Sequence, residues 1–162
     1  MQGISFNLDN PQWKKEFPEY KTIISNAVKK TFQSENISGQ NNHISVFLTS
    51  DENIKDLNLK YRNKNKATNV LAFPIQESIE KQNYIGDLAI SLEKIIFESN
   101  KYKIKKNKYL SKITIHGILH LLGYDHISDD DYEVMNEIED RLINELYCCL
   151  LYTSPSPRDD EL

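Results

Sequence analysis

Three of the four histidines in this 162-residue chain fall within one short segment, as His116, His120 and His126. On a helix, His116 and His120 are four residues apart, so both rings lie on one face, roughly 6 Å apart along the axis. That separation lets two imidazoles bind one ion at zinc–nitrogen distances of about 2.0–2.1 Å. The spacing therefore predicts a shared metal ion, and zinc is the metal that imidazole ligands suit.

The residues after this pair allow a third ligand. Gly123 can adopt the left-handed conformation that ends a helix, after which the chain can turn and bring His126 back towards the first two histidines. The alternative is three unrelated histidines in the core or on the surface. That alternative is costly, since each buried imidazole nitrogen needs a polar partner. The remaining histidine, His43, is expected to be an ordinary surface residue.

Three neutral ligands would leave the zinc its full double charge and an open fourth position. That arrangement is typical of catalytic zinc, whose bound water has a pKa of about 7. A structural zinc is usually closed by cysteine. Cys148 or Cys149 could close this site, although both follow at the end of the next predicted helix. We expect one catalytic zinc per chain.

The histidine spacing equals that of the metzincin peptidases, H-E-x-x-H-x-x-G-x-x-H, in which the glutamate is the general base. Gly117 stands where that glutamate would be. A zinc peptidase or amidase would therefore lack its usual base, so the spacing supports zinc while arguing against proteolysis.

Several segments together resemble the YbeY family of bacterial endoribonucleases. They occur in the family's order and cover roughly residues 44 to 146. Asn69 stands where the family more usually has aspartate. The segments are HGILHLLGYDH at 116–126, LNLKYR at 57–62, TNVLAFP at 68–74 and GDLAIS at 86–91.

The resemblance implies a zinc-dependent, single-strand-specific endoribonuclease. Its action would be in 3′-end maturation of small-subunit ribosomal RNA and in ribosome quality control, with single-stranded ribosomal RNA and the ribosome as partners. Position by position, it makes His116, His120 and His126 the zinc ligands and Arg62 the residue that faces the phosphate. A ribosome-binding module with structural zinc is the remaining alternative.

Arg62 fits that role chemically, because a guanidinium pairs with phosphate oxygens through a planar fork. It could equally cap the end of its helix or pair with a surface acid. Two lysine-rich segments, at 60–66 and 101–112, could hold an RNA backbone despite the net charge of −4. Tyr61 and Phe73 could stack on bases, although core packing is the simpler expectation for both.

The bulk properties fit one cytoplasmic domain. The two cysteines are adjacent and form no disulfide framework, which favours a reducing compartment. Residues 1–20 lack the pattern of a signal peptide, and no stretch is long and apolar enough to span a membrane. We expect a domain over residues 1–150. Residues 151–162, rich in Ser, Pro and acid, are expected to be a disordered tail of the kind that vector read-through produces.

The hydrophobic pattern predicts an α+β fold, with one mixed sheet of about four strands and four or five helices packed on it. The expected strands are 4–8, 44–48, 70–73 and 85–92, the third stopped by Pro74 and the fourth with a bulge at Gly86. The expected helices begin at Pro18, at Asp51, after residue 92 with a break near Asn107, and after the capping signal at Ser128.

Overall fold

The computed structural model describes residues 3–37, 42–75, 84–125 and 128–153, the last five of these by their backbone alone. Four strands form one sheet in the order β1–β2–β4–β3. β1 (Gly3–Leu8) pairs in parallel with β2 (His43–Thr49), and β2 pairs in parallel with β4 (Tyr84–Ser91). β3 (Val70–Pro74) pairs antiparallel with β4 and forms one edge. The predicted mixed sheet of four strands is confirmed.

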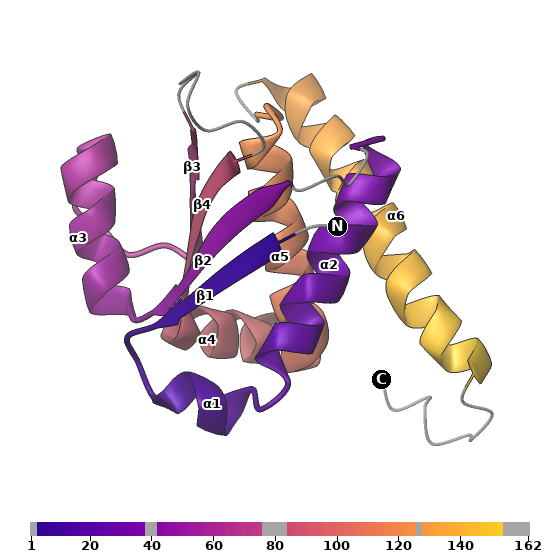
Figure 1. Cartoon of the computed structure of the whole chain (residues 1–162), viewed down its shortest axis with the longest axis horizontal. Coiled ribbons are helices and arrows are strands. Elements are labelled where there is room, and N and C mark those ends of the chain that lie inside the picture. Colours follow the sequence, from indigo (N-terminus) through magenta and orange to yellow (C-terminus); the bar gives the residue numbers. More distant parts are fainter. Residues whose placement is uncertain (1–2, 38–41, 76–83, 126–127, 154–162) are drawn as a thin grey trace.

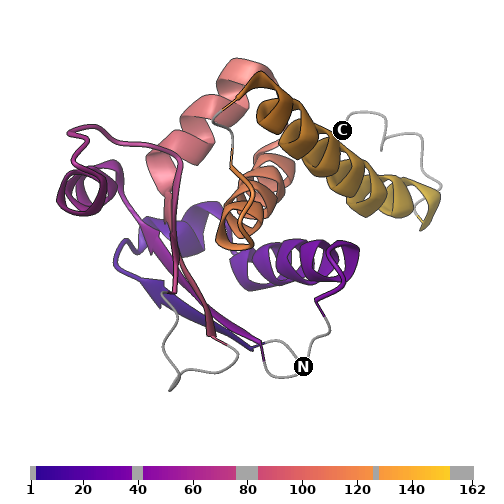
Figure 2. The same cartoon turned by 90° about the horizontal axis from the view of Figure 1, so that it is seen from above.

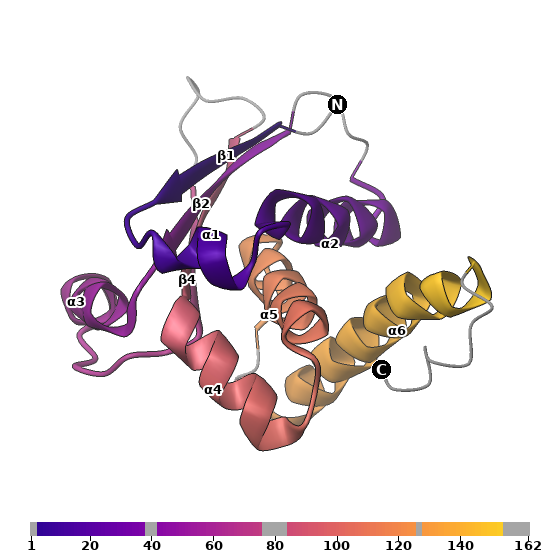
Figure 3. The same cartoon turned by 90° about the horizontal axis from the view of Figure 1, so that it is seen from below.

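Helices cover the two faces of the sheet unequally (Figures 1, 2 and 3). α2 (Tyr20–Ser34) and α5 (Lys106–Leu121) lie on one face, and α6 (Asp129–Thr153) packs across both of them. α4 (Leu92–Tyr102) contacts the start of α5, and α3 (Asp51–Arg62) lies on the opposite face of the sheet. With α1 (Gln12–Glu16), the described residues contain six helices, where four or five were expected.

α1 escaped prediction because it is barely more than one turn long, too short for a hydrophobic period to show. It is held through Trp13, which is completely buried and whose indole Nε1 donates to the carbonyl of Thr49 at 2.9 Å. α3 also differs in detail: its cap is Ser50, whose hydroxyl accepts from the amide of Asn53, and Asp51 is the first helical residue.

The break expected near Asn107 occurs at Lys103, which ends α4 in the left-handed conformation. The cap expected at Ser128 is confirmed, because its hydroxyl accepts from the amide of Asp131 at 3.2 Å. α6 continues to Thr153, past the expected domain boundary at residue 150. The rest of the expected tail, 154–162, lies outside the described residues. No helix among the described residues is long and apolar enough to cross a membrane.

Pro74 does not stop β3 as predicted but is its last residue, paired with Gly86. A proline is tolerated there because β3 is an edge strand. The bulge predicted at Gly86 is confirmed by a register shift in the β2–β4 pairing. Gly86 has φ +150°, and a Cβ would stand 2.5 Å from the carbonyl oxygen of Phe73, so only glycine fits.

α5 is the central helix of the fold. Ile115, Ile118 and Leu119 on it are completely buried. Gly117 brings the helix close to the sheet, because a Cβ at this position would stand 2.8 Å from Leu88 and 3.1 Å from Val70. This close packing fixes the height and rotation of α5 over β3 and β4, and with them the direction of its remaining side chains.

Candidate functional site

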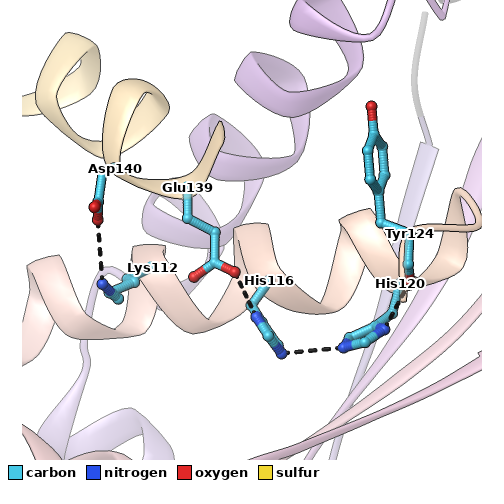
Figure 4. A network of polar contacts seen from close by, with 6 residues as sticks. All are labelled: Lys112, His116, His120, Tyr124, Glu139 and Asp140. Carbon is cyan, nitrogen blue, oxygen red and sulfur yellow. Dashed lines mark hydrogen bonds and ion pairs between the residues drawn. The ribbon is translucent and has the colours of Figure 1, made fainter. Parts of the chain in front are cut away.

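His116 and His120 point towards one another from the last turns of α5 (Figure 4). Their Nε2 atoms are 3.1 Å apart, and the rings meet nearly edge to face, with centroids 4.6 Å apart. Two nitrogen ligands of one tetrahedral zinc lie about 3.3 Å apart, given zinc–nitrogen bonds of about 2.0–2.1 Å. The pair therefore already has the separation that a shared ion requires.

The Nδ1 atom of each imidazole has a hydrogen-bond partner on another residue. Nδ1 of His120 lies 3.0 Å from the carbonyl oxygen of Tyr124, and Nδ1 of His116 lies 2.5 Å from a carboxylate oxygen of Glu139. A carbonyl or carboxylate oxygen accepts, so each Nδ1 carries the proton and donates. In neutral rings, both Nε2 atoms then present lone pairs to each other, an arrangement that suits a cation between them.

Glu139 comes from α6 and is almost completely buried, with 3% of its surface exposed. It stands among Met135, Leu142 and Ile143, which pack on α5. Sequence reasoning missed it. The available signal was a carboxylate within the apolar stripe of α6, four residues after Met135 and three before Leu142, because a buried charge at such a position needs a partner.

Tyr124 holds the chain just beyond α5. Its hydroxyl donates to Glu35 at the end of α2, at 2.6 Å. That hydrogen bond, with burial as the lesser cause, raises the pKa of the Tyr124 phenol, because the neutral hydroxyl is the form that donates. The anchored ring keeps the Tyr124 carbonyl in place against His120.

Gly117 faces the sheet rather than the histidine pair, as its approach to Leu88 and Val70 shows. A side chain at position 117 would enter the packed layer between α5 and the sheet. Position 117, where a metzincin has its catalytic base, therefore points into the core. The sheet lies too close to α5 at this position to leave room for a glutamate side chain.

The histidines open onto a groove of about 680 Å³ that runs beside β3. Arg62, Lys64 and Lys66 line it together with His116 and His120, so the structure unites Arg62 with two of the three predicted ligands. Nη2 of Arg62 donates to the carbonyl oxygen of Ala72 at 2.9 Å, which places the guanidinium against the strand.

His126, the third predicted ligand, lies outside the described residues. Among those that are described, no three His, Cys, Asp or Glu side chains form a metal-binding group.

The segment that carries the groove lysines is positioned by the end of α3. Asn63 adopts the left-handed conformation there, and the amide of Lys64 donates to the carbonyl of Asn58 at 3.2 Å. The side chain of Asn58 is buried and donates to the carbonyl of Lys66 at 2.9 Å. These bonds turn the chain back towards β3, so that Lys64 and Lys66 lie beside the groove.

Other residues considered from the sequence lie elsewhere. The second lysine cluster does not line the groove, and two of its members form ion pairs, Lys106 with Glu16 and Lys112 with Asp140. His43 is half-buried at the start of β2, where Ser5 lies within hydrogen-bond distance. The core position expected for Tyr61 is wrong, because 59% of its surface is exposed, a consequence of its place near the end of α3.

Asn69, which stands where the resemblance leads one to expect aspartate, also lines the groove. Its amide donates to Glu98 at 3.0 Å, and the hydroxyl of Tyr109 donates to the same carboxylate oxygen at 2.6 Å. Burial, followed by the bond to Glu98, raises the pKa of the Tyr109 phenol. An aspartate at 69 would place two carboxylates together, whereas the amide supplies the donor that Glu98 needs.

The groove of this α+β fold is lined by two facing imidazoles and three cationic side chains. Such a site suits a hydrolase that acts on an anionic substrate. Comparison with known proteins narrows this class. The family model described as Endoribonuclease YbeY matches residues 7–147. The chain belongs to the YbeY endoribonuclease family.

Individual members of the family match this chain over most of its length. The Endoribonuclease YbeY of Pelagibacter ubique is 37% identical over 130 residues, which is 79% of this chain and 85% of that protein. That of Bartonella bacilliformis is 32% identical over 149 residues, 90% and 94% of the two chains. A solution structure from Thermotoga maritima superposes with a TM-score of 0.58 at 28% identity, covering 95% of this chain and 94% of that one.

Proposed function

We propose that this protein is a zinc-dependent endoribonuclease that cleaves single-stranded RNA in the groove beside β3. The observation that carries the proposal is the facing pair of Nε2 atoms, 3.1 Å apart, with both Nδ1 atoms held by Glu139 and Tyr124. The donor set fits zinc, and His126 is the proposed third ligand. When bound, zinc would supply Lewis acidity for attack at the phosphodiester.

The chain's own residues would orient the substrate. Arg62, fixed against Ala72, would pair with phosphate oxygens of the RNA, while Lys64 and Lys66 would hold the backbone further along the groove. Glu139 and Tyr124 would keep the histidine rings from turning. The distribution of charge supports RNA as the substrate, because these three cations gather in the groove of a chain whose net charge is −4.

We further propose that the physiological substrate is ribosomal RNA, cleaved in 3′-end maturation of the small-subunit species and in ribosome quality control, with the ribosome as partner. Membership of the YbeY family supports this assignment. Accumulation of small-subunit RNA with an extended 3′ end in cells that lack the protein would support it. Normally processed 3′ ends in such cells would contradict it.

A parallel assay separates this proposal from the peptidase alternative. Unstructured RNA, the same RNA in a duplex, and casein are incubated with the protein, with and without chelator, and with His116→Ala as the control for contaminating enzymes. We expect cleavage of the single strand alone, abolished by chelator and in the variant. Casein cleavage that disappears in His116→Ala, with RNA left intact, would establish a peptidase instead. Metal removal that unfolds the chain would favour a structural zinc.

A further inference from the structure

The edge strand β3 presents its main chain to the groove, and the hydrogen bonds at its two ends show which residues face outward. The amide of Ser91 donates to the carbonyl of Asn69 at 3.0 Å, and the amide of Ile75 donates to the carbonyl of Ile85 at 3.2 Å. In an antiparallel pair, the residues that bond across the ladder alternate with residues that face away. Because Asn69 and Ile75 both bond to β4, the odd-numbered residues of this segment turn their main-chain N–H and carbonyl groups towards β4.

The even-numbered residues, Val70, Ala72 and Pro74, consequently turn their main-chain groups away from β4. The bond from Arg62 to the carbonyl oxygen of Ala72 confirms this independently, because an atom engaged in the ladder would not be accessible to α3. In each such residue, the N–H and the carbonyl point to the same side of the strand. The N–H groups of Val70 and Ala72 therefore face outward as well.

Pro74 has no N–H, so Val70 and Ala72 carry the outward-facing donors of β3, and all three residues line the groove. Val70 and Ala72 are nearly buried, with 9% and 4% of their surfaces exposed. A main-chain donor in such a place needs a partner, and within the described residues none is present opposite either N–H. A ligand in the groove would supply that partner.

The chemistry beside these donors favours an anion. Arg62 binds the carbonyl of Ala72, so its guanidinium stands next to the outward face of that residue and offsets the negative end of the carbonyl dipole. Lys64 and Lys66 add positive charge to the same groove, which His116 also lines. Neutral main-chain donors next to a fixed guanidinium are a common way to bind phosphate.

We propose that the N–H groups of Val70 and Ala72 donate to phosphate oxygens of the RNA strand, with the Ala72 donor and Arg62 acting on one phosphate. The inference rests on the proposed function, since it assigns a subsite of the same groove. An extended peptide could pair with the same edge. The three cationic side chains and the absence of an N–H at Pro74 favour an RNA backbone over a peptide. A peptide strand would need uncharged surroundings and a longer row of main-chain donors.

Amide hydrogen exchange measured by NMR tests this in the unmodified full-length protein. The probe is a short single-stranded 2′-O-methyl RNA, checked by gel to be intact after the measurement. We expect exchange at Val70 and Ala72 to slow by at least tenfold when the RNA binds. Leu71 is the internal control, since its amide bonds to β4 and should be protected with and without RNA.

A variant gives a second measurement. Ala72→Pro removes the donor, and the strand already accepts proline at the equivalent outward position 74. Affinity for the RNA should fall roughly tenfold to a hundredfold, as expected for a lost hydrogen bond to a charged group. Ala72→Gly is the comparison, because it loses only the methyl group and keeps the N–H, so it should bind RNA at least tenfold more tightly than Ala72→Pro. Equal affinity in the two variants would contradict a role for this donor.

The outcomes separate the inference from the proposed function. If the protein binds and cleaves RNA but exchange at Val70 and Ala72 is unchanged, the subsite is wrong and the nuclease assignment stands. If no RNA is bound at all, both fail. Protection of these two amides by an extended peptide and not by RNA would make the edge a peptide-binding site.

Discussion

Glu139 places a carboxylate oxygen 2.5 Å from Nδ1 of His116, although the two residues are 23 positions apart and belong to different helices. The carboxylate is buried, whereas the histidine is partly open to the groove. A carboxylate that accepts from Nδ1 fixes the ring's orientation and directs Nε2 towards His120. This contact links the packing of α6 on α5 to the geometry of the proposed metal site.

Glu139→Gln should weaken zinc binding by about tenfold to a hundredfold, which is the usual effect of removing a partner of a ligand histidine. The amide keeps the shape of the side chain but no longer provides a charged acceptor. The measurement is competition for zinc against a chromogenic chelator. Glu137→Gln is the matched control, because Glu137 is exposed on the same helix. Equal affinity in the two variants would remove Glu139 from the site.

A separate readout follows the orientation of the ring itself. The tautomer of His116 can be measured from the ¹⁵N shifts of its imidazole without added zinc. We expect the Nδ1–H form in the unmodified protein and a mixture of tautomers in Glu139→Gln, since the amide can accept or donate. A purely structural role for Glu139 would leave the tautomer unchanged.

His120→Ala should abolish zinc binding, because His116 and one further ligand rarely hold zinc tightly. The unmodified protein should contain about one zinc per chain, measured by elemental analysis. His43→Ala is the control, since that histidine lies at the start of β2 and does not line the groove. Full metal occupancy in His120→Ala would overturn the assignment.

Arg62→Ala should keep its zinc and its fold yet cleave RNA at least tenfold more slowly, since a lost bond to a charged group costs about 1.5–3 kcal/mol. Arg62→Lys should recover part of the activity, because lysine supplies charge without the planar fork. Lys60→Ala, on the same helix but outside the groove, is the comparison. Activity at the unmodified level in Arg62→Ala would reduce Arg62 to a helix-end residue.

Gly117→Glu recreates the peptidase motif but should destabilise the protein rather than add proteolysis. The new carboxylate would point at Leu88 and Val70, and burying an unpaired charge costs several kcal/mol, roughly 3–5. Asn107→Glu, exposed at the start of the same helix, should leave the free energy of unfolding within about 0.5 kcal/mol. Urea denaturation gives both values. A stable Gly117→Glu variant that digests casein would contradict the direction assigned to this side chain.

Much of the local structure could be predicted because it depends on spacing along the chain. Alternating and helical periods identified the four strands and the longer helices, and the four-residue spacing of His116 and His120 placed both on one face of α5. α1 is missed since one turn carries no period. The predicted strand ends at Phe73, one residue before Pro74, because the tolerance of a proline depends on whether the strand lies at an edge of the sheet.

The partners of the site residues were decided by tertiary structure alone. The motif around His116 does not indicate that Glu139 reaches it from α6, that Arg62 binds Ala72, or that position 117 faces Leu88. Each of these depends on how separate elements pack, and side-chain periodicity reports only whether a face is apolar, not which element covers it. The sequence by itself therefore determined which residues could do the chemistry. The close packing of α5 between the sheet and α6 decided which neighbours hold them in place.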